Sequence, residues 1–274
     1  MSIRLIVAPY DDGRLDWRMG RGARAIASAV AEPAETIEDI DPARPPIGRA
    51  FDVAAELSAR VRAARERGEQ PFVLAGNCNS SLGTASGLDG RVGVVWFDAH
   101  ADFDTPDENE SGFFDVMALA ILTGNGWRAL RERIPGFRAV REEDVVLAAV
   151  RDLEPYQHEA IERSGVTAVP GAVDEGAFEA AIDRLAERVD SVYLHVDLDA
   201  VDAAEGRANQ YAATGGPTAA ELLRRVELVR ERLPVGATAL TAYDPDADPE
   251  GRVLALALEL LRPPRRPAAP SGGA

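Results

Sequence analysis

The stretch from residue 94 to residue 104 limits more strongly than any other what this chain can fold into. Four apolar residues, 94–97, are followed by Asp98-Ala99-His100-Ala101-Asp102. The apolar run predicts a buried strand, and side chains of an extended segment alternate between its faces. We therefore expect Asp98, His100 and Asp102 to point the same way at the strand's C-terminal end, where open α/β sheets hold their chemistry. This pattern favours a metal site over a solvated loop.

A second stretch, residues 192–199, repeats this arrangement. It is again an apolar run, and it ends in Asp197 and Asp199, two residues apart. Together the two strand ends offer four carboxylates and one imidazole, and like charges in one crevice raise each other's pKa unless cations are present. Two divalent ions would neutralise them. An oxygen-rich set with some nitrogen suits Mn²⁺ or a similar metal, and a metal pair can activate a water molecule.

These residues give the chain a resemblance to the ureohydrolases, the family of binuclear manganese enzymes that contains arginase, agmatinase and formimidoylglutamase. Residues 98–102 resemble the family's D-A-H-x-D motif, and residues 195–202, His-Val-Asp-Leu-Asp-Ala-Val-Asp, resemble its S-x-D-x-D-x-x-D-P motif. Residues 75–79, Ala-Gly-Asn-Cys-Asn, match the G-G-D-H-S motif loosely. The motifs occur in the family's order, between about residue 72 and residue 245. The resemblance implies that the metal ligands are Cys78, Asp98, His100, Asp102, Asp197 and Asp199, with Asp98 and Asp197 bridging both ions.

Cys78 departs from the family pattern, which has His at this position. A thiolate can bind a metal, but it is a soft ligand that favours Zn²⁺ or Fe²⁺ over Mn²⁺. A free cysteine is also commonly a small buried core residue, and the sequence leaves both interpretations open. A branch of the family that resembles Nω-hydroxyarginine hydrolases carries Cys here as well. His195 has two interpretations too: it orients a ligating carboxylate, or it is a hydrogen-bonded core histidine.

The same resemblance suggests which residues meet the substrate. Residues 104–112 keep the spacing of the arginase substrate loop, so Asp104 and Ser111 are predicted to bind substrate. Asp115 stands where arginases have a proton-shuttling His, and we predict Asp115 and His100 as catalytic residues. Asp152 and Glu154, in a segment similar to the arginase R-D-x-D sequence, would hold an α-amino group. The Glu that grips the guanidinium in the family is replaced by Ala242, and Asp244 could take its place.

Composition narrows the class of protein. The chain has 274 residues, 46% of them hydrophobic, enough for one sizeable α/β domain. Its net charge of −16 argues against nucleic acid or an anionic membrane as a partner. The family resemblance implies a small guanidino or amidino compound as the partner. All basic residues are Arg, which excludes a Schiff-base lysine. Cys78 is the only cysteine, and no signal peptide or membrane-spanning run is visible, so we expect a cytoplasmic protein.

The order of apolar runs predicts an α/β fold, a three-layer doubly wound parallel sheet of about eight strands. The family resemblance implies the arginase-like arrangement of these strands. We expect one domain over residues 1–262 and a disordered Pro/Gly/Ala-rich tail over residues 263–274. The family resemblance implies a homo-oligomer, a trimer or a hexamer. The expected strands are residues 3–8, 36–40, 72–74, 94–97, 145–150, 167–169, 192–196 and 238–241.

Three functions are consistent with these residues. The first is hydrolysis of a linear guanidino or amidino C–N bond, on an arginine-like or N-hydroxyarginine-like substrate, by a metal-bridging hydroxide. The second is a degenerate ureohydrolase fold with a regulatory or structural role, which the changes at Cys78, Asp104, Asp115 and Ala242 would motivate. The third is a related deacetylase, but that chemistry needs a further His pair, which a chain with three His does not readily supply.

Overall fold

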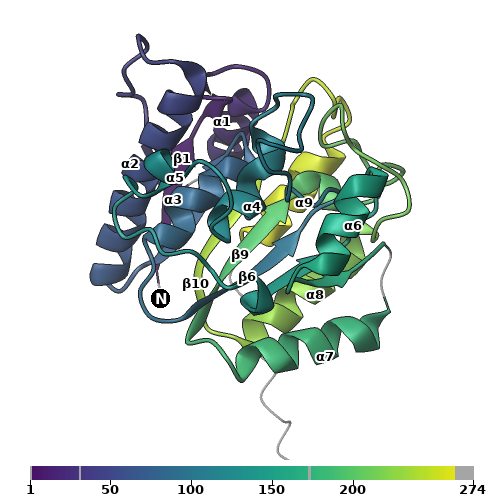
Figure 1. Ribbon diagram of the computed structural model, residues 1–274. Coiled ribbons are helices and arrows are strands. Elements are labelled where there is room, and N and C mark those ends of the chain that lie inside the picture. Colours follow the sequence, from purple (N-terminus) through teal and green to yellow (C-terminus); the bar gives the residue numbers. More distant parts are fainter. Residues whose placement is uncertain (1, 31, 172–173, 263–274) are drawn as a thin grey trace, which may run out of the picture.

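The computed structural model describes residues 2–30, 32–171 and 174–262. Its centre is an eight-stranded sheet with strand order β4-β1-β5-β10-β9-β6-β7-β8, and every neighbouring pair is parallel. Two helical layers enclose this sheet (Figure 1). The predicted fold class is therefore confirmed. The predicted tail, residues 263–274, lies outside the described residues.

The strands of this sheet alternate with helices along the chain. They are β1 (Ile3–Ala8), β4 (Ala34–Thr36), β5 (Gln70–Ala75), β6 (Val92–Phe97), β7 (Val145–Ala148), β8 (Thr167–Val169), β9 (Ser191–Asp197) and β10 (Val235–Thr241). The central strands are buried on both faces, as parallel strands between helical layers must be. Their sequences are consequently continuous apolar runs.

The helices connect successive strands. The longer ones are α1 (Gly20–Ala29), α2 (Pro46–Glu66), α6 (Pro155–Arg163), α7 (Glu175–Ala186), α8 (Ala219–Arg232) and α9 (Arg252–Leu260). Shorter ones are α3 (Ser81–Ser86), α4 (Ala118–Leu122) and α5 (Arg128–Arg131), together with the 3₁₀ turns η1 (Cys78–Ser80), η2 (Asp115–Met117), η3 (Glu142–Asp144) and η4 (Leu198–Ala200). None of the helices in the described ranges has the length and apolar character to cross a bilayer.

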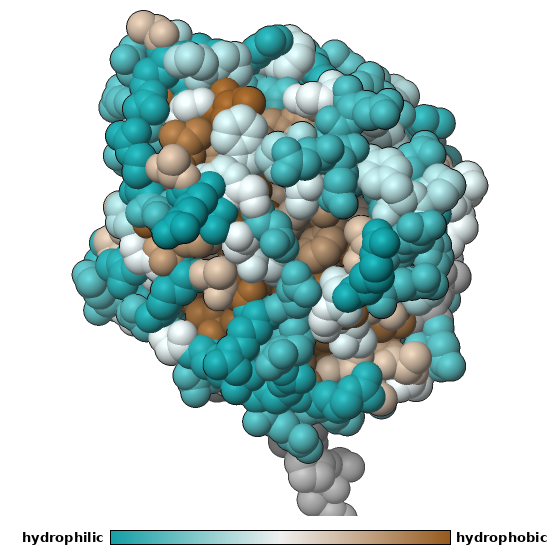
Figure 2. All heavy atoms as spheres, viewed as in Figure 1, coloured by the Kyte–Doolittle hydropathy of each residue, from teal (hydrophilic) through white to brown (hydrophobic). Residues whose placement is uncertain are grey.

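The sheet divides the apolar core into two layers. Residues of α2, α3, α4 and α6 pack on one face, and residues of α1, α7, α8 and α9 pack on the other. Trp96 and Phe97, adjacent in β6, point into opposite layers, as strand alternation requires. The face in Figure 2 is mainly hydrophilic, with apolar residues in separate patches. Because helices pack on both faces of the sheet, the ends of β5, β6, β9 and β10 are held at fixed spacing.

Two local features were not predicted. A short antiparallel hairpin, β2 (Tyr10–Asp11) and β3 (Arg14–Leu15), follows β1. In this region Asp12, Asp16 and Arg18 have positive φ values of 49°, 53° and 44°. Such conformations are uncommon for residues other than glycine, and the sequence pattern gives no sign of them. This segment lies next to the site described below, because the Asp12 amide donates to the Asn77 side chain.

Candidate metal centre

The predicted metal ligands come together at the C-terminal ends of three strands, β5, β6 and β9. Cys78 follows β5, Asp98 to Asp102 follow β6, and Asp197 and Asp199 stand at the end of β9. One pocket between these strand ends is lined by Cys78, His100, Asp102, Asp197 and Asp199, and Asp98 is bonded to His100 at its side. Residues more than a hundred positions apart thus share one site, as the sequence predicted.

Asp98 and Asp197 are deeply buried carboxylates, each held by two hydrogen-bond donors. The Trp96 indole N–H donates to Asp98 Oδ2 at 2.9 Å, and the His100 amide donates to Asp98 Oδ1 at 2.8 Å. The Asp199 amide donates to Asp197 Oδ1 at 2.8 Å, and the Cys78 thiol donates to Asp197 Oδ2 at 2.9 Å. These four donors fix both carboxylates, but none of the four carries a positive charge.

Asp102 reaches the site in a way that strand alternation does not explain. β6 ends at Phe97, and Asp102 has a φ of 49°, so residues 98–102 form a turn and not an extended segment. The prediction that these side chains converge because they alternate on a strand was wrong about the cause. Asp102 lines the pocket, yet its buried Oδ2 has no hydrogen-bond partner among the described residues. An unsatisfied buried carboxylate oxygen is costly, and a bound cation would satisfy it.

His100 lies closer to the opening than the carboxylates do. Its Nδ1 is 3.2 Å from Asp98 Oδ1 and 3.5 Å from Asp199 Oδ2, and its Nε2 is 3.7 Å from Asp152 Oδ2. Asp98, His100 and Asp199 each offer one ligand atom within 4.8 Å of the others. Asp199 is also held by the Asn209 amide, at 3.1 Å. Two carboxylates and an imidazole at this spacing can hold one divalent ion.

The electrostatics of the protein without metal favour protonation of the site. Burial raises the pKa of Asp98, Asp102 and Asp197, and neighbouring carboxylates raise it further. Burial opposes charge on His100 as well, but Asp199 and Asp98 outweigh it and raise the pKa of His100 to about 10. Protons therefore occupy positions that divalent cations could take, and metal binding would release them. The donor set fits two divalent ions.

Asp115 is held in place beside the ligands by the residues around Cys78. The Asn79 amide donates to its Oδ1 at 2.9 Å, and the Asn77 side chain donates to its Oδ2 at 2.8 Å. Asp115 lines the same pocket, and burial raises its pKa to about 8. A carboxyl group with this pKa exchanges protons near neutral pH.

The predicted substrate-binding residues lie outside the lining of the pocket. Asp104 is buried and accepts hydrogen bonds from Asn109, Tyr156 and Gln157, at 2.7, 2.8 and 2.8 Å. This carboxylate therefore links the loop after β6 to α6. Ser111 is exposed and bonds Asn109. The predicted substrate residues are Asp104, Ser111, Asp152, Glu154 and Asp244. None of these five lines the pocket.

The other three predicted substrate residues, Asp152, Glu154 and Asp244, contact other residues. Glu154 caps α6 in a reciprocal pair with Gln157. Asp244 accepts from the Asp246 amide and lies 3.6 Å from the Arg21 guanidinium. Asp152 is exposed, and its contact with His100 is its link to the site. The roles predicted for these residues remain predictions.

Several residues of the site were not predicted from the sequence. Asn209 is buried and joins Asp199 to the Ala242 carbonyl. Tyr211 and Phe113 line the pocket with ring centroids 5.8 Å apart, and Arg18 donates to the Tyr211 hydroxyl at 2.8 Å. Arg151 donates to six backbone carbonyls, those of Ala149, Asp199, Ala200, Val201, Ala213 and Thr214. Isolated polar residues in loops give no periodic signal, so only the fold identifies them.

Known proteins share this architecture and part of the sequence. The arginase family model matches residues 2–263. An arginase of Staphylococcus aureus (strain MRSA252) is 30% identical over 207 residues, which cover 72% of this chain and 68% of the relative. The arginase of Bacillus caldovelox is 30% identical over 215 residues, covering 75% and 72%.

Solved structures of other proteins have a similar fold. The Bacillus cereus arginase superposes with a TM-score of 0.83 at 23% identity, over 95% of this chain and 97% of the other. A formimidoylglutamase from Bacillus subtilis gives a TM-score of 0.75 at 17% identity, over 95% and 86%. The strand-end carboxylates, the family match along nearly the whole chain and the relatives at 30% identity together show that this chain belongs to the arginase family of ureohydrolases, which are amidinohydrolases.

Proposed function

We propose that this protein hydrolyses a C–N bond of a linear guanidino or amidino compound with two divalent metal ions in the site. The observation that carries the proposal is a set of buried carboxylates: Asp102, Asp197 and Asp199 line one pocket with His100 and Cys78, and Asp98 is bonded to His100 beside it. A chain would not bury this many carboxylates together without a function for them, since each costs free energy when it is unpaired. Mn²⁺ is the metal that the family resemblance implies.

The proposed ligands divide between the two ions. Asp98 and Asp197 would bridge them, His100 and Asp199 would complete the shell of one ion, and Asp102 and Cys78 that of the other. When bound, such a metal pair supplies Lewis acidity and lowers the pKa of a water molecule. The Trp96 indole and the backbone amides of His100 and Asp199 hold the carboxylates in position. This support makes the site rigid before substrate enters.

Asp115 is the group we propose for moving a proton. It lines the pocket, its pKa is raised to about 8 by burial, and Asn77 and Asn79 fix both of its oxygens. A protonated Asp115 can deliver a proton to the departing nitrogen and recover one from solvent. We expect Asp115→Asn to lower turnover about 100-fold or more, within the usual range for loss of general acid–base catalysis, while metal content stays unchanged.

The substrate is proposed to be arginine-like or N-hydroxyarginine-like. Ala242 lines the pocket where a family carboxylate would grip a guanidinium, so this chain offers no planar partner there for a strongly basic group. A hydroxyguanidine or amidine is less basic than a guanidine and depends less on such a carboxylate. The Cys78 position supports the same choice, because the resembling Nω-hydroxyarginine branch also carries Cys.

The alternative is a ureohydrolase-fold protein without catalytic activity, and Ala242 is the observation that favours it. The intact carboxylate set argues against it. A protein that had lost its chemistry would have no need to keep Asp102 Oδ2 buried without a partner.

A substrate panel tests the proposal. The manganese-loaded protein is incubated with arginine, Nω-hydroxyarginine, agmatine and formimidoylglutamate, and the released urea, hydroxyurea, formamide and amine products are measured by chromatography. We expect turnover of at least one compound, and its loss in Asp98→Asn. Asp144→Asn is the matched control, because Asp144 is equally buried but lies at the opposite edge of the sheet. Full metal occupancy with no product from any compound would overturn the proposal in favour of the alternative.

A further inference from the structure

We propose that one of the two metal positions is formed by Cys78, Asp98 and His195, and that it selects Zn²⁺ rather than Mn²⁺. The inference rests on the proposed function only in assuming a two-metal site, and it assigns to His195 a role that the family motif does not give it. The position would be a sulfur, oxygen and nitrogen site, distinct in chemistry from the one offered by Asp98, His100 and Asp199.

The spacing of the three side chains carries the inference. Cys78, Asp98 and His195 are all buried, and each offers one ligand atom within 4.8 Å of the others. Thr241 Oγ1 lies 3.4 Å from Cys78 Sγ and 3.3 Å from His195 Nε2. Because one hydroxyl contacts both atoms, Nε2 is the ring nitrogen that faces the thiol. Metal sites form where such atoms already converge.

His195 is positioned as a metal-binding histidine requires. Trp96 and His195 are partners in neighbouring strands, and their rings stack with centroids 3.6 Å apart. The other ring nitrogen, Nδ1, lies 2.7 Å from the Tyr193 hydroxyl. When Nδ1 carries the proton and donates it to Tyr193, Nε2 presents its lone pair to the site. A partner for the second nitrogen is the usual support of a ligating histidine.

A second observation points to a cation here independently of the cysteine. Asp102 lines the pocket with Cys78, and its buried Oδ2 has no partner among the described residues. A cation at this position would satisfy that oxygen. The thiolate, the imidazole and the carboxylates assigned to this ion, the bridging Asp197 among them, make a set with sulfur and nitrogen of the kind that Zn²⁺ takes, whereas the harder Mn²⁺ prefers oxygen.

The two proposed metal positions therefore differ in the metal ion that each prefers. The Cys78 position is buried and soft, and the position at Asp98, His100 and Asp199 is partly open and rich in oxygen. Binding at the Cys78 position replaces the thiol proton, which the Cys78 side chain donates to Asp197 in the metal-free protein, and this proton leaves to solvent. We expect a mixed pair when both metals are available, Zn²⁺ at the first position and Mn²⁺ at the second.

Cobalt spectroscopy and metal competition test the assignment without relying on activity. Protein stripped of metal is loaded with Co²⁺, and the near-ultraviolet thiolate-to-cobalt absorption and the visible bands are recorded. In parallel, stripped protein is equilibrated with equal Zn²⁺ and Mn²⁺, and the bound metals are counted by plasma mass spectrometry. We expect the thiolate band in the wild type and close to one Zn²⁺ per chain.

Three variants separate the ligands. Cys78→Ser should abolish the thiolate band, and His195→Gln should shift the visible bands and weaken zinc binding by at least about tenfold, since losing even a supporting residue costs 10- to 100-fold. His158→Gln is the matched control, because His158 is an exposed helical histidine that pairs with Glu162, and it should change nothing. An unchanged spectrum and zinc affinity in His195→Gln would return His195 to a core-packing role.

X-ray absorption of the wild-type zinc protein gives the same answer should a variant fail to fold. One sulfur and at least one nitrogen in the zinc shell support the assignment, and a shell of oxygen with a single nitrogen from His100 overturns it. The two proposals fail separately. Zinc bound by Cys78 and His195 without hydrolysis would contradict only the proposed function, and manganese-dependent hydrolysis with no sulfur ligand would contradict only this inference.

Discussion

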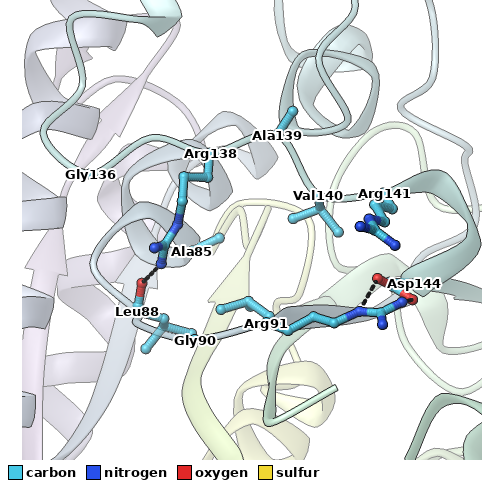
Figure 3. Close-up of a pocket in the computed structure, with 11 residues that line it drawn as sticks. Ala85, Leu88, Gly90, Arg91, Gly136, Arg138, Ala139, Val140, Arg141 and Asp144 are labelled. Atoms are coloured by element: carbon cyan, nitrogen blue, oxygen red, sulfur yellow. Dashed lines mark hydrogen bonds and ion pairs between the residues drawn. The ribbon is translucent and has the colours of Figure 1, made fainter. Parts of the chain in front are cut away.

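The N-terminal ends and the C-terminal ends of the strands form two opposite edges of the central sheet. Both edges contain buried carboxylates, but the carboxylates are neutralised in different ways. At the N-terminal edge, Asp144 accepts from the Arg91 guanidinium through both oxygens at 3.0 Å, and Arg188 lies 3.1 Å away. Figure 3 shows Arg91 and Asp144 beside a cavity of about 370 Å³. At the C-terminal edge, none of the described arginines forms an ion pair with Asp98, Asp102 or Asp197.

The difference supports a cation-binding role for the second group of carboxylates. Arg151 is the arginine that contacts the Asp199 backbone, yet its hydrogen bonds go to backbone carbonyls and not to a carboxylate. A chain that neutralises Asp144 with two arginines could do the same for Asp98. Leaving the carboxylates at the C-terminal edge without arginine keeps their charge available for cations from solution. The larger cavity lies at the arginine-rich edge, so cavity size alone would point to the wrong end of the sheet.

The largest expected effect comes from removing a bridging carboxylate. Asp98→Asn or Asp197→Asn should lower hydrolysis by more than about 100-fold, because even a residue that only supports a ligand costs 10- to 100-fold. Steady-state rates under metal saturation measure this. Turnover kept within a few-fold of the wild type would rule out a two-metal mechanism at these residues.

A pH series contrasts the metal-free and metal-loaded states. The raised pKa values of Asp11 (about 6), Asp115 (about 8) and His100 (about 10) mean that the folded metal-free protein holds more protons than the unfolded chain. Its stability should therefore fall as pH rises through this range. Metal binding requires the protons of its ligands, His100 among them, to leave, so the metal-induced rise in melting temperature should grow between pH 5.5 and pH 8.5. Calorimetry showing a constant difference would contradict the predicted proton release.

The Asp144→Ala variant tests how much the arginine contacts at the N-terminal edge contribute to stability. Without this carboxylate, Arg91 and Arg188 lose their buried partner, and we expect the melting temperature to fall by about 2–6 °C. The arginines are partly exposed, so water limits the loss. Metal content should not change. A variant that lost its metals would mean that the two edges are not independent.

The smallest expected effect has the opposite sign. Asp102→Asn should stabilise the metal-free protein at pH 8, because burial and Asp98 oppose charge on Asp102 and raise its pKa. The same change should weaken metal binding. Urea unfolding with and without metal measures both effects, and destabilisation in both conditions would show that Asp102 is a structural residue.

The strand pattern and the position of the site could be predicted from the sequence, because both depend on local runs of apolar residues ending in acids. β1 and β8 occupy the predicted residues. The contacts of the site could not be predicted, since they join distant segments. His195 faces Cys78 only because β9 lies between β6 and β10, and the partners of Asp104 come from α6. The turn at Asp102 depends on a positive φ that nothing in the residue pattern reveals.

Metal content per chain tests the central claim most directly. The protein is purified after growth with manganese and zinc supplied, and bound metals are counted by plasma mass spectrometry alongside Asp98→Asn. The contrast between the two sheet edges predicts close to two ions per wild-type chain and fewer in the variant. A folded wild-type protein with almost no bound metal would contradict it, and would show that these carboxylates are kept for a purpose other than binding cations.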